Sequence, residues 1–398
     1  MPSLHTVFAG PWRAVLVLGV TQIICWGALF YPVVLTVPLI AAERGFSATF
    51  AMGGFSLALL IAGFVSPAVG RMIDRYGGHR VMPVGSLLGA LGLVALVYAE
   101  HPAAYLAVWI LLGVAIGASL YDPAFATLGR IFGAGARSPI TALTLAGGFA
   151  STVSWPVTYL LIQHVGWRGT YLVYAGVLAF IAAPLHAFVL PRSRVELPLP
   201  TTGAAKPPAP VLPPHGWAFI MVTTAFTAYA FVPSGLSAHL LAIFGRAGID
   251  AATVVIIGAL FGPSQVIARI CELMFARGLH PLVVARLSVG ILLAAFALIA
   301  WLGLSAPTAA AFMVMFGMAN GLITIARGTV PLVLFGPIGY GALLGRIAGP
   351  WLVMQAMAPL VLAFIAERTS DPAALALAAL LGIVSFVSLV ILRAPKRA

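Results

Sequence analysis

Long apolar runs recur along the whole chain, and they restrict its fold more than any other feature of the sequence. Twelve runs are long enough to cross a membrane, since about 20 residues of helix span the hydrocarbon core. They occupy residues 12–41, 48–69, 81–99, 103–132, 138–164, 168–190, 217–243, 252–275, 281–303, 307–335, 341–366 and 372–392. The first run is too long for the core of a signal peptide. We therefore expect an all-α membrane protein with twelve transmembrane helices.

The composition agrees with a surface that faces lipid. Of the 398 residues, 62% are hydrophobic and 8% are charged, whereas about a quarter of a soluble domain is charged. The net charge of +12 is spread between the apolar runs, which argues against a nucleic-acid-binding face. Cys25 and Cys271 lie inside apolar runs, so we expect two small buried thiols and no disulfide framework.

Basic residues are divided unequally between the two sides of the membrane. If the N-terminus is cytoplasmic, fifteen Arg and Lys residues fall on that side, against Arg44, Arg168, Arg246 and Arg368 on the other. Cytoplasmic loops are enriched in Arg and Lys, so we expect both termini in the cytoplasm. The excess of Arg over Lys, with abundant Ala and Gly, is typical of a GC-rich bacterial genome. The inner membrane of a bacterial cell is therefore the expected location.

The two halves of the chain repeat each other. The matched positions, at offsets of 205 and 204, are Trp12 with Trp217, Trp26 with Phe231, Gly113 with Gly317 and Gly117 with Gly321. The glycine pairs are small-xxx-small motifs, which permit close helix packing. Parallel six-helix repeats with a substrate site between them are typical of secondary transporters.

A proline-rich segment separates the halves. Residues 191–216 contain eight prolines, which predicts an extended, semi-rigid tether. The expected organisation is an N-terminal six-helix bundle at 1–190, a cytoplasmic linker at 191–216 and a C-terminal six-helix bundle at 217–398.

The loop between the second and third runs carries a motif. It reads Gly70-Arg71-Met72-Ile73-Asp74-Arg75-Tyr76-Gly77-Gly78-His79-Arg80. Its glycines suit close helix packing and a tight turn, and Asp74 can accept hydrogen bonds from arginines or from a helix N-terminus. The loop resembles the signature loop of the major facilitator superfamily, with Gly70, Asp74, Arg75, Gly77 and Arg80 at the matching positions. The resemblance implies that this loop latches the two halves together on the cytoplasmic side.

The second half contains a degenerate copy of this loop. Arg269-Ile-Cys-Glu272 can be laid on Arg71-Met-Ile-Asp74, but no glycine turn follows in register. This leaves two interpretations, a one-sided latch or an accidental likeness.

Three other stretches resemble the monocarboxylate and oxalate/formate porters of the superfamily. They are Tyr121 to Arg137, Gly166-Trp167-Arg168 and residues 262–269. In monocarboxylate porters the eighth helix carries an aspartate four residues before an arginine that handles the carboxylate. Arg269 matches that arginine, whereas Gln265 stands at the aspartate position, so the usual proton-coupling pair is incomplete.

Three charged residues lie deep inside apolar runs, namely Asp122, Arg269 and Arg327. Inserting such a charge into the middle of a membrane costs about 2.5–3.5 kcal/mol on insertion scales, so we expect each one to have a functional or structural role. The repeat maps Asp122 onto Ala326, next to Arg327, so we expect these two charges to form a gate or substrate pair in which the aspartate alternates between paired and protonated states. A static salt bridge is the alternative. Pro123 leaves the carbonyl of Ser119 without its helical partner, which predicts a bend there.

Two fixed cations against one titratable acid favour an anionic substrate, because a guanidinium suits a carboxylate. For Arg269 the alternative is snorkelling to the surface with Glu272 as partner. His239 is a candidate for proton traffic. The remaining candidates for substrate contact are Gln22, Trp26, Tyr31, Gln265, Asn320 and Gln355.

Together these features predict a secondary active transporter of a small organic anion, a monocarboxylate, driven by protons or by exchange. The expected partners are that anion, protons and the lipid bilayer, with no nucleic acid and a monomeric state. Efflux of a hydrophobic or drug-like compound is the alternative. A transporter-like sensor would need a soluble signalling domain. An intramembrane enzyme would need a clustered nucleophile, metal or acid–base set, and the sequence contains none of these, nor a P-loop or cofactor motif.

Overall fold

The computed structural model describes residues 10–192, 212–276 and 278–393, and these are helical almost throughout. Eleven helical segments are long and apolar enough to cross a membrane. One of them, Arg137–Val189, has 53 residues and would be about 80 Å long if it were straight. It turns back at Gly166, whose φ of 67° and ψ of 178° are open to a residue without a Cβ. That segment therefore crosses twice, and the described chain has the twelve crossings that the hydropathy predicts.

The first half forms a bundle of six crossings, several of which are broken helices. The first crossing combines α2 and α3, the fourth combines α6 and α7, and the fifth combines α8 with the beginning of α9. The sixth crossing is the rest of α9 with two π-helical turns, η2 and η3. In chain order the elements are α2 (Arg13–Leu29), α3 (Val33–Arg44), α4 (Ala48–Tyr76), α5 (Gly78–Tyr98), α6 (Pro102–Ser119), α7 (Tyr121–Phe132), the 3-10 turn η1 (Gly133–Gly135), α8 (Arg137–Gly148), α9 (Ala150–Val177), η2 (Leu178–Ala182) and η3 (Leu185–Val189).

The second half forms the other bundle of six crossings, with its second crossing divided between α11 and α12. Its elements are α10 (Trp217–Arg246), α11 (Ala251–Ala259), α12 (Phe261–Phe275), α13 (Pro281–Leu302), α14 (Ala306–Phe335), α15 (Tyr340–Arg368) and α16 (Asp371–Ile391). Cys25 is buried as expected, whereas Cys271 is exposed, because it lies on the outer face of α12. Most of the predicted linker, residues 193–211, lies outside the described residues.

Polar caps mark helix starts between the apolar runs. The side chains of Ser47, Asp250 and Ser370 each accept a hydrogen bond from the backbone N–H three residues later. Such caps satisfy N–H groups that have no partner inside the helix. Short polar segments therefore fix where α4, α11 and α16 begin.

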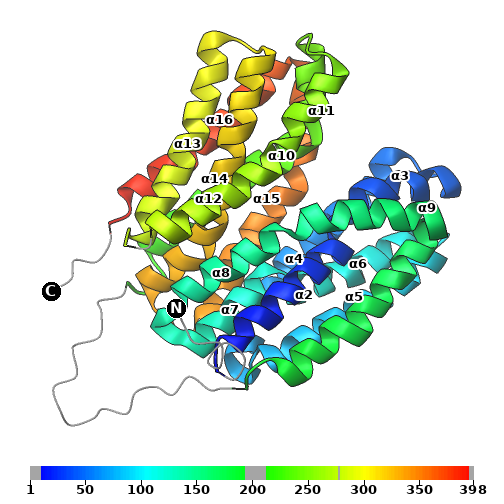
Figure 1. Ribbon diagram of the computed structural model, residues 1–398, viewed down its shortest axis with the longest axis vertical. Coiled ribbons are helices and arrows are strands. Elements are labelled where there is room, and N and C mark those ends of the chain that lie inside the picture. Colours follow the sequence, from blue (N-terminus) through cyan, green and yellow to red (C-terminus); the bar gives the residue numbers. More distant parts are fainter. Residues whose placement is uncertain (1–9, 193–211, 277, 394–398) are drawn as a thin grey trace.

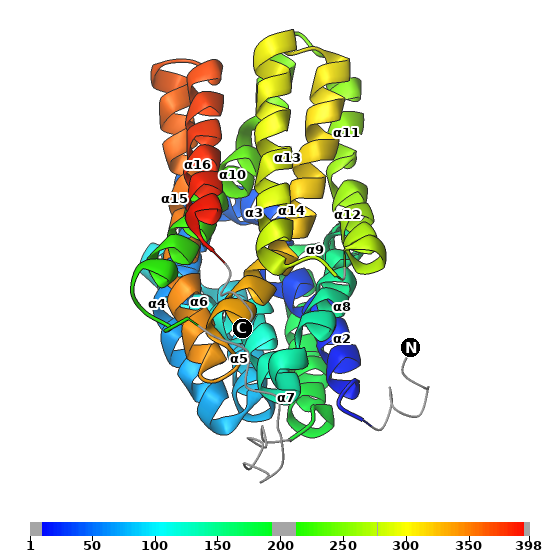
Figure 2. The ribbon, with the colours of Figure 1, turned by 90° about the vertical axis from the view of Figure 1, so that its left-hand side faces the viewer.

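The two bundles meet at one side of the molecule and diverge toward the other (Figure 1). The described ends of the chain lie where the bundles meet, and we call this the terminal side. Here α8 packs on α12, as Figure 2 shows from the direction at right angles. Their continuations toward the opposite side, α9 and α11, share no extensive contact within the described residues. The structure is thus closed on the terminal side.

The largest contact between the bundles runs along α4 and α15, and glycines make it possible. A Cβ at Gly63 would come 2.9 Å from the Gly349 carbonyl oxygen, and one at Gly345 would come 2.8 Å from the Cα of Pro67. A Cβ at Gly70 would overlap the backbone of the facing helix. Small residues allow helix backbones to approach this closely.

Asp74 lies at the terminal end of this contact. Its Oδ1 accepts a hydrogen bond of 2.9 Å from the N–H of Gly341, and its Oδ2 accepts one of 2.8 Å from the N–H of Ala342. Both donors belong to the first turn of α15, where free N–H groups and the helix dipole favour a carboxylate. Of the two kinds of partner that the sequence allows for the Asp74 carboxylate, the structure has the helix N-terminus, while Arg130 donates to the backbone carbonyl of Asp74.

The other residues of the predicted signature loop stay within the first bundle. Gly77 ends α4 with a φ of 84°, and α5 begins at the next residue. The Arg75 guanidinium lies 5.1 Å from the ring centroid of Tyr76, and Arg80 is exposed. The contact with the second bundle is thus made by Asp74 and by the close approach at Gly70.

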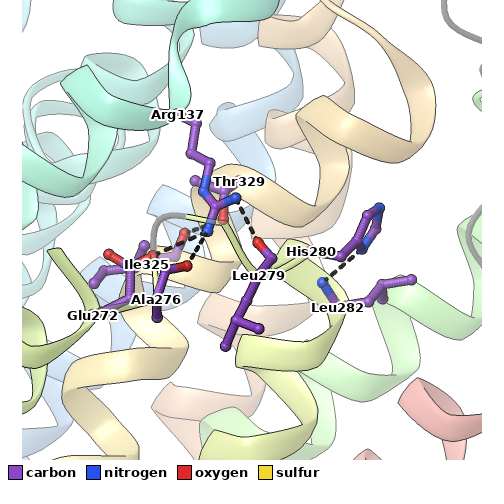
Figure 3. Close-up of polar contacts among 8 residues, drawn as sticks. All are labelled: Arg137, Glu272, Ala276, Leu279, His280, Leu282, Ile325 and Thr329. Atoms are coloured by element: carbon purple, nitrogen blue, oxygen red, sulfur yellow. Dashed lines mark hydrogen bonds and ion pairs between the residues drawn. The ribbon is translucent and has the colours of Figure 1, made fainter. Parts of the chain in front are cut away.

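A second polar contact closes the terminal side between α8 and α12. Arg137, the first residue of α8, places Nη2 3.3 Å from Oε1 of Glu272 and 3.1 Å from the carbonyl oxygen of Ala276. Its Nη1 lies 2.6 Å from the carbonyl oxygen of Leu279, and Figure 3 shows the side chain reaching from α8 to the end of α12. Glu272 is the residue that aligns with Asp74, so the expectation of a one-sided latch is wrong.

The two contacts use opposite helix polarity. The Asp74 carboxylate meets the N-terminal amides of α15, whereas the Arg137 guanidinium meets the carbonyl of Ala276, the C-cap of α12. Each charge therefore complements the partial charge of the helix end that it touches.

Replacing Gly345 should open the terminal side. In Gly345→Val the new side chain would overlap α4, and overpacking of this kind costs about 1–3 kcal/mol, or roughly a tenfold to hundredfold shift in the closed population. The measurement is maleimide labelling of Ile140→Cys, a fully buried position facing Gly328 of the other bundle, with both native cysteines replaced by alanine. Gly53→Val on α4, where a Cβ meets nothing within 4 Å, is the control and should label as slowly as the parent.

Removing the Arg137 side chain should have a similar effect by a different route. Hydrogen bonds to charged groups contribute about 1.5–3 kcal/mol, so Arg137→Ala should raise the labelling rate of Ile140→Cys at least about tenfold. Arg286 also donates to two carbonyls, those of Leu389 and Leu392, but inside one bundle. Arg286→Ala is therefore the matched control, and equal labelling in the two variants would contradict a latch at Arg137.

Candidate functional site

The fourth crossing breaks where the sequence predicts a bend. Helix α6 ends at Ser119 and α7 begins at Tyr121, with Leu120 extended at φ −85° and ψ −153°. Since Pro123 has no N–H, it cannot donate to the carbonyl of Ser119. The side chain of Gln22 on α2 supplies the missing donor, with Nε2 2.8 Å from that carbonyl oxygen. The break places Asp122 in the first turn of α7.

Asp122 forms an ion pair with Arg327 of α14, across the junction of the two bundles. Oδ1 of Asp122 lies 3.0 Å from Nη2 of Arg327, and the side chains are 15% and 9% exposed. The Arg327 guanidinium also lies 4.7 Å from the ring centroid of Trp351 on α15. Arg327 is thus held by a carboxylate from one bundle and an aromatic ring from the other, and both groups attract a guanidinium.

Arg269 of α12 also joins the two bundles, and it is buried at 3% exposure. Its Nη1 donates to the carbonyl of Thr144 on α8 at 2.9 Å, and its Nε lies 3.4 Å from the carbonyl oxygen of Gly321 on α14. The absence of a side chain at Gly148 leaves room for the guanidinium. The snorkelling alternative is wrong, because the Arg269 side chain is buried and Glu272 pairs with Arg137.

Gln265 and Asn320 lie beside Arg269. The Oε1 of Gln265 accepts a hydrogen bond of 3.0 Å from Nδ2 of Asn320, and Nη2 of Arg269 lies 3.4 Å from the same oxygen. Within the described part of the chain, the hydrogen-bond acceptors of Arg269 are therefore all neutral oxygens. A buried cation that has no carboxylate among the described residues is costly, and an incoming anion would lower that cost.

Gln22 does not have the substrate-lining position that the sequence suggests. Its side chain is fully buried, with Nε2 on the Ser119 carbonyl and Oε1 accepting from Nε1 of Trp26 at 3.1 Å. Both polar ends of the amide are engaged. Gln22 is thus a positioning residue that supports the broken helix and holds the Trp26 ring.

Trp26 and Tyr31 belong to an aromatic group on the first bundle. Their ring centroids are 5.9 Å apart, and Trp26 lies 5.2 Å from the ring of Tyr121, the neighbour of Asp122. These predicted residues are therefore brought next to the charged junction.

His239 is placed away from the ion pair, whereas Gln355 lies four residues, or about one turn, after Trp351 on α15. His239 has Nε2 3.0 Å from the carbonyl oxygen of Pro359, and Gln355 accepts a bond from Ser234 through its backbone carbonyl. On α15, Pro359 lies eight residues and about 12 Å beyond Trp351. The structure therefore keeps His239 within the second bundle, toward the opposite side, and does not bring it to Asp122.

Sequence reasoning missed Trp351, the Thr144 carbonyl and the pairing of Arg137 with Glu272. A backbone carbonyl has no signature in sequence, and one tryptophan among eight cannot be singled out by composition. The alignment of Glu272 with Asp74 was the one available signal for the second contact. In the described part of the chain, no three His, Cys, Asp or Glu side chains come together as metal ligands.

The family model of the Major Facilitator Superfamily matches residues 15–345. Human monocarboxylate transporter 11 is 32% identical over 162 residues, covering 39% of this chain and 32% of that protein. The mouse transporter of the same name is 29% identical over 318 residues, covering 77% of this chain and 62% of that protein. The chain therefore spans about a third of the human relative and less than two thirds of the mouse relative.

Solved structures show the same fold. The human organic anion transporter MFSD10 (TETRAN) superposes with a TM-score of 0.73 at 16% identity, covering 95% of this chain and 99% of that one. The proton:xylose symporter XylE superposes with a TM-score of 0.71 at 11% identity, covering 94% of each chain. The chain belongs to the major facilitator superfamily.

Proposed function

We propose that this protein is a secondary active transporter that moves a small monocarboxylate across the bacterial inner membrane by alternating access, coupled to one proton at Asp122. The observation that carries the proposal is the charge balance at the bundle junction. Two buried arginines, Arg269 and Arg327, lie at this junction, and one carboxylate, Asp122, pairs with Arg327. When Asp122 is protonated, a substrate monoanion can take the place of its carboxylate, so that the net charge of the junction is the same with and without substrate.

Arg327 links the proton to the anion. While Asp122 is ionised, it occupies the guanidinium that a substrate carboxylate would use. Protonation removes the charge of Asp122 and frees Arg327 for the substrate, since a guanidinium stays charged at any physiological pH. One proton and one monoanion then move together without net charge. Acidification on the side of entry should favour uptake.

Arg269 links substrate binding to the movement of the bundles. Its Nη1 holds α8 through the Thr144 carbonyl, and a substrate carboxylate would compete for that donor, because charge-assisted hydrogen bonds are stronger than neutral ones. Substrate binding would therefore weaken one of the contacts that keep the terminal side closed. The contacts at Asp74 and Arg137 are the others that must break for that side to open.

The proposed orientation places the terminal side in the cytoplasm, because the excess of Arg and Lys falls on that side. The described state is then closed to the cytoplasm. The similarity to monocarboxylate transporters supports the substrate class. So does the fold shared with a human protein described as an organic anion transporter.

Asp122→Asn should uncouple transport from the proton. The amide is permanently neutral, so proteoliposomes should retain exchange of a labelled monocarboxylate between the two sides and lose accumulation driven by a pH gradient. Asp371→Asn is the matched control, because Asp371 pairs with Arg246 at 2.7 Å inside the second bundle. If uptake and its pH dependence both survive in Asp122→Asn, coupling at this residue is excluded.

Arg327→Lys should weaken substrate binding while it keeps a positive charge beside Asp122. Lysine cannot bind a carboxylate in the bidentate fork geometry of arginine, and we expect a loss of about tenfold or more in the affinity for monocarboxylates, which corresponds to about 1.4 kcal/mol. The measurement is the half-saturating concentration in exchange assays. Arg346→Lys, whose parent side chain contacts Phe219 and the Pro214 carbonyl, is the control. An unchanged affinity in Arg327→Lys would rule out bidentate recognition.

A further inference from the structure

A row of four aromatic rings leads away from the ion pair. It starts at Tyr121, the neighbour of Asp122, and passes through Trp26 and Tyr31 to Trp155. Successive ring centroids lie 5.2, 5.9 and 6.1 Å apart. These separations fall within the range of favourable aromatic contacts. The four residues come from α7, α2, the segment between α2 and α3, and α9, so the fold and not a local repeat assembles the row.

The row runs from a buried end to an accessible end. Tyr121 is 8% exposed and Trp155 is 51% exposed, with Trp26 and Tyr31 partly buried between them. Trp155 lies on α9, the part of the fifth crossing that continues past the closed terminal side. There α9 has no extensive contact with α11 of the other bundle within the described residues. The accessible end of the row thus belongs to the side on which the bundles diverge.

Polar groups beside the row are already engaged. The Trp26 Nε1 donates to Gln22, the Gln22 amide donates to the Ser119 carbonyl, and Asn320 donates to Gln265. A substrate hydroxyl or second carboxylate next to the first carboxylate would have to break one of these bonds. Leaving a buried donor or acceptor unpaired is costly. Trp26 therefore offers a substrate its ring face and no free donor, so the part of the substrate that covers this ring should be apolar and flat.

We propose that the site takes an aryl monocarboxylate, a single carboxylate joined to a planar aromatic ring, and that the ring stacks on Trp26 and Tyr31 while the carboxylate binds Arg327. This inference rests on the proposed function and adds the identity of the group that the carboxylate carries. Short aliphatic or hydroxylated acids would use the arginines and leave the rings uncovered.

The test compares four acids on the full-length protein in proteoliposomes. Benzoate, cyclohexanecarboxylate, propionate and lactate are each added as competitors of labelled benzoate exchange, and their binding is checked by thermal shift. We expect benzoate to bind at least about tenfold more tightly than propionate and lactate, and more tightly than cyclohexanecarboxylate, which has similar size without a π face.

Two outcomes would overturn the aryl preference and leave the transport proposal standing. One is propionate or lactate binding as tightly as benzoate, and the other is cyclohexanecarboxylate equalling benzoate. If none of the four acids binds and organic cations do, the proposed function itself fails. The two failures are therefore distinguishable.

Trp155→Ala tests the ring contact apart from the carboxylate contact, because Trp155 packs edge-on against Tyr31, one of the two rings on which the substrate ring is proposed to stack. Because Trp155 is half exposed, its removal should leave the fold intact, weaken benzoate binding about tenfold and leave propionate binding unchanged. Trp301→Ala is the matched control, since Trp301 on α13 is 92% exposed and lies in the second bundle. Equal losses for benzoate and propionate in Trp155→Ala would overturn the stacking role.

Discussion

The close approach of α4 and α15 determines where everything else in the molecule can lie. Glycines on both helices bring the two backbones together along the terminal half of the bundle contact. With the bundles closed at this side, α7 comes beside α14 and α8 beside α12. Asp122 can therefore reach Arg327, and Arg269 can reach the Thr144 carbonyl. The charged junction thus depends on the close backbone packing of α4 against α15.

The electrostatics of the junction follow from an unequal division of charge between two related halves. The first bundle contributes the acid, Asp122, and the second contributes Arg269 and Arg327. A buried arginine needs acceptors, and Arg269 finds them in two backbone carbonyls and one amide oxygen. The neutral Gln265 at the position of a branch aspartate leaves this cation without a fixed counter-ion. The ion pair and the unneutralised arginine together suit a site that exchanges a proton and an anion.

Two polar contacts hold the closed side, and they lie at positions that the internal repeat matches, although their partners differ. Asp74 and Glu272 occupy aligned positions, yet Asp74 binds amides of a helix start and Glu272 binds an arginine. At the second contact the donor is the Arg137 guanidinium, where the first contact uses the amides of a helix N-terminus. This guanidinium also donates to the backbone carbonyls that follow α12. Either arrangement satisfies groups that a helix end leaves unpaired. The two halves therefore make a contact at matching positions, but different chemical groups form it.

The sequence alone determined the number of crossings, the two halves, the signature loop at Gly70–Arg80 and the three buried charges, because each depends on local composition or spacing. Hydropathy reports that a residue is away from water, but not which neighbour its side chain meets. Only the tertiary structure shows that Gln22 donates a hydrogen bond to the Ser119 carbonyl and that His239 lies far from Asp122. It also shows that Glu272 pairs with Arg137 and not with Arg269. These contacts join residues about 100 or more positions apart, and only the packing of the helices brings such positions together.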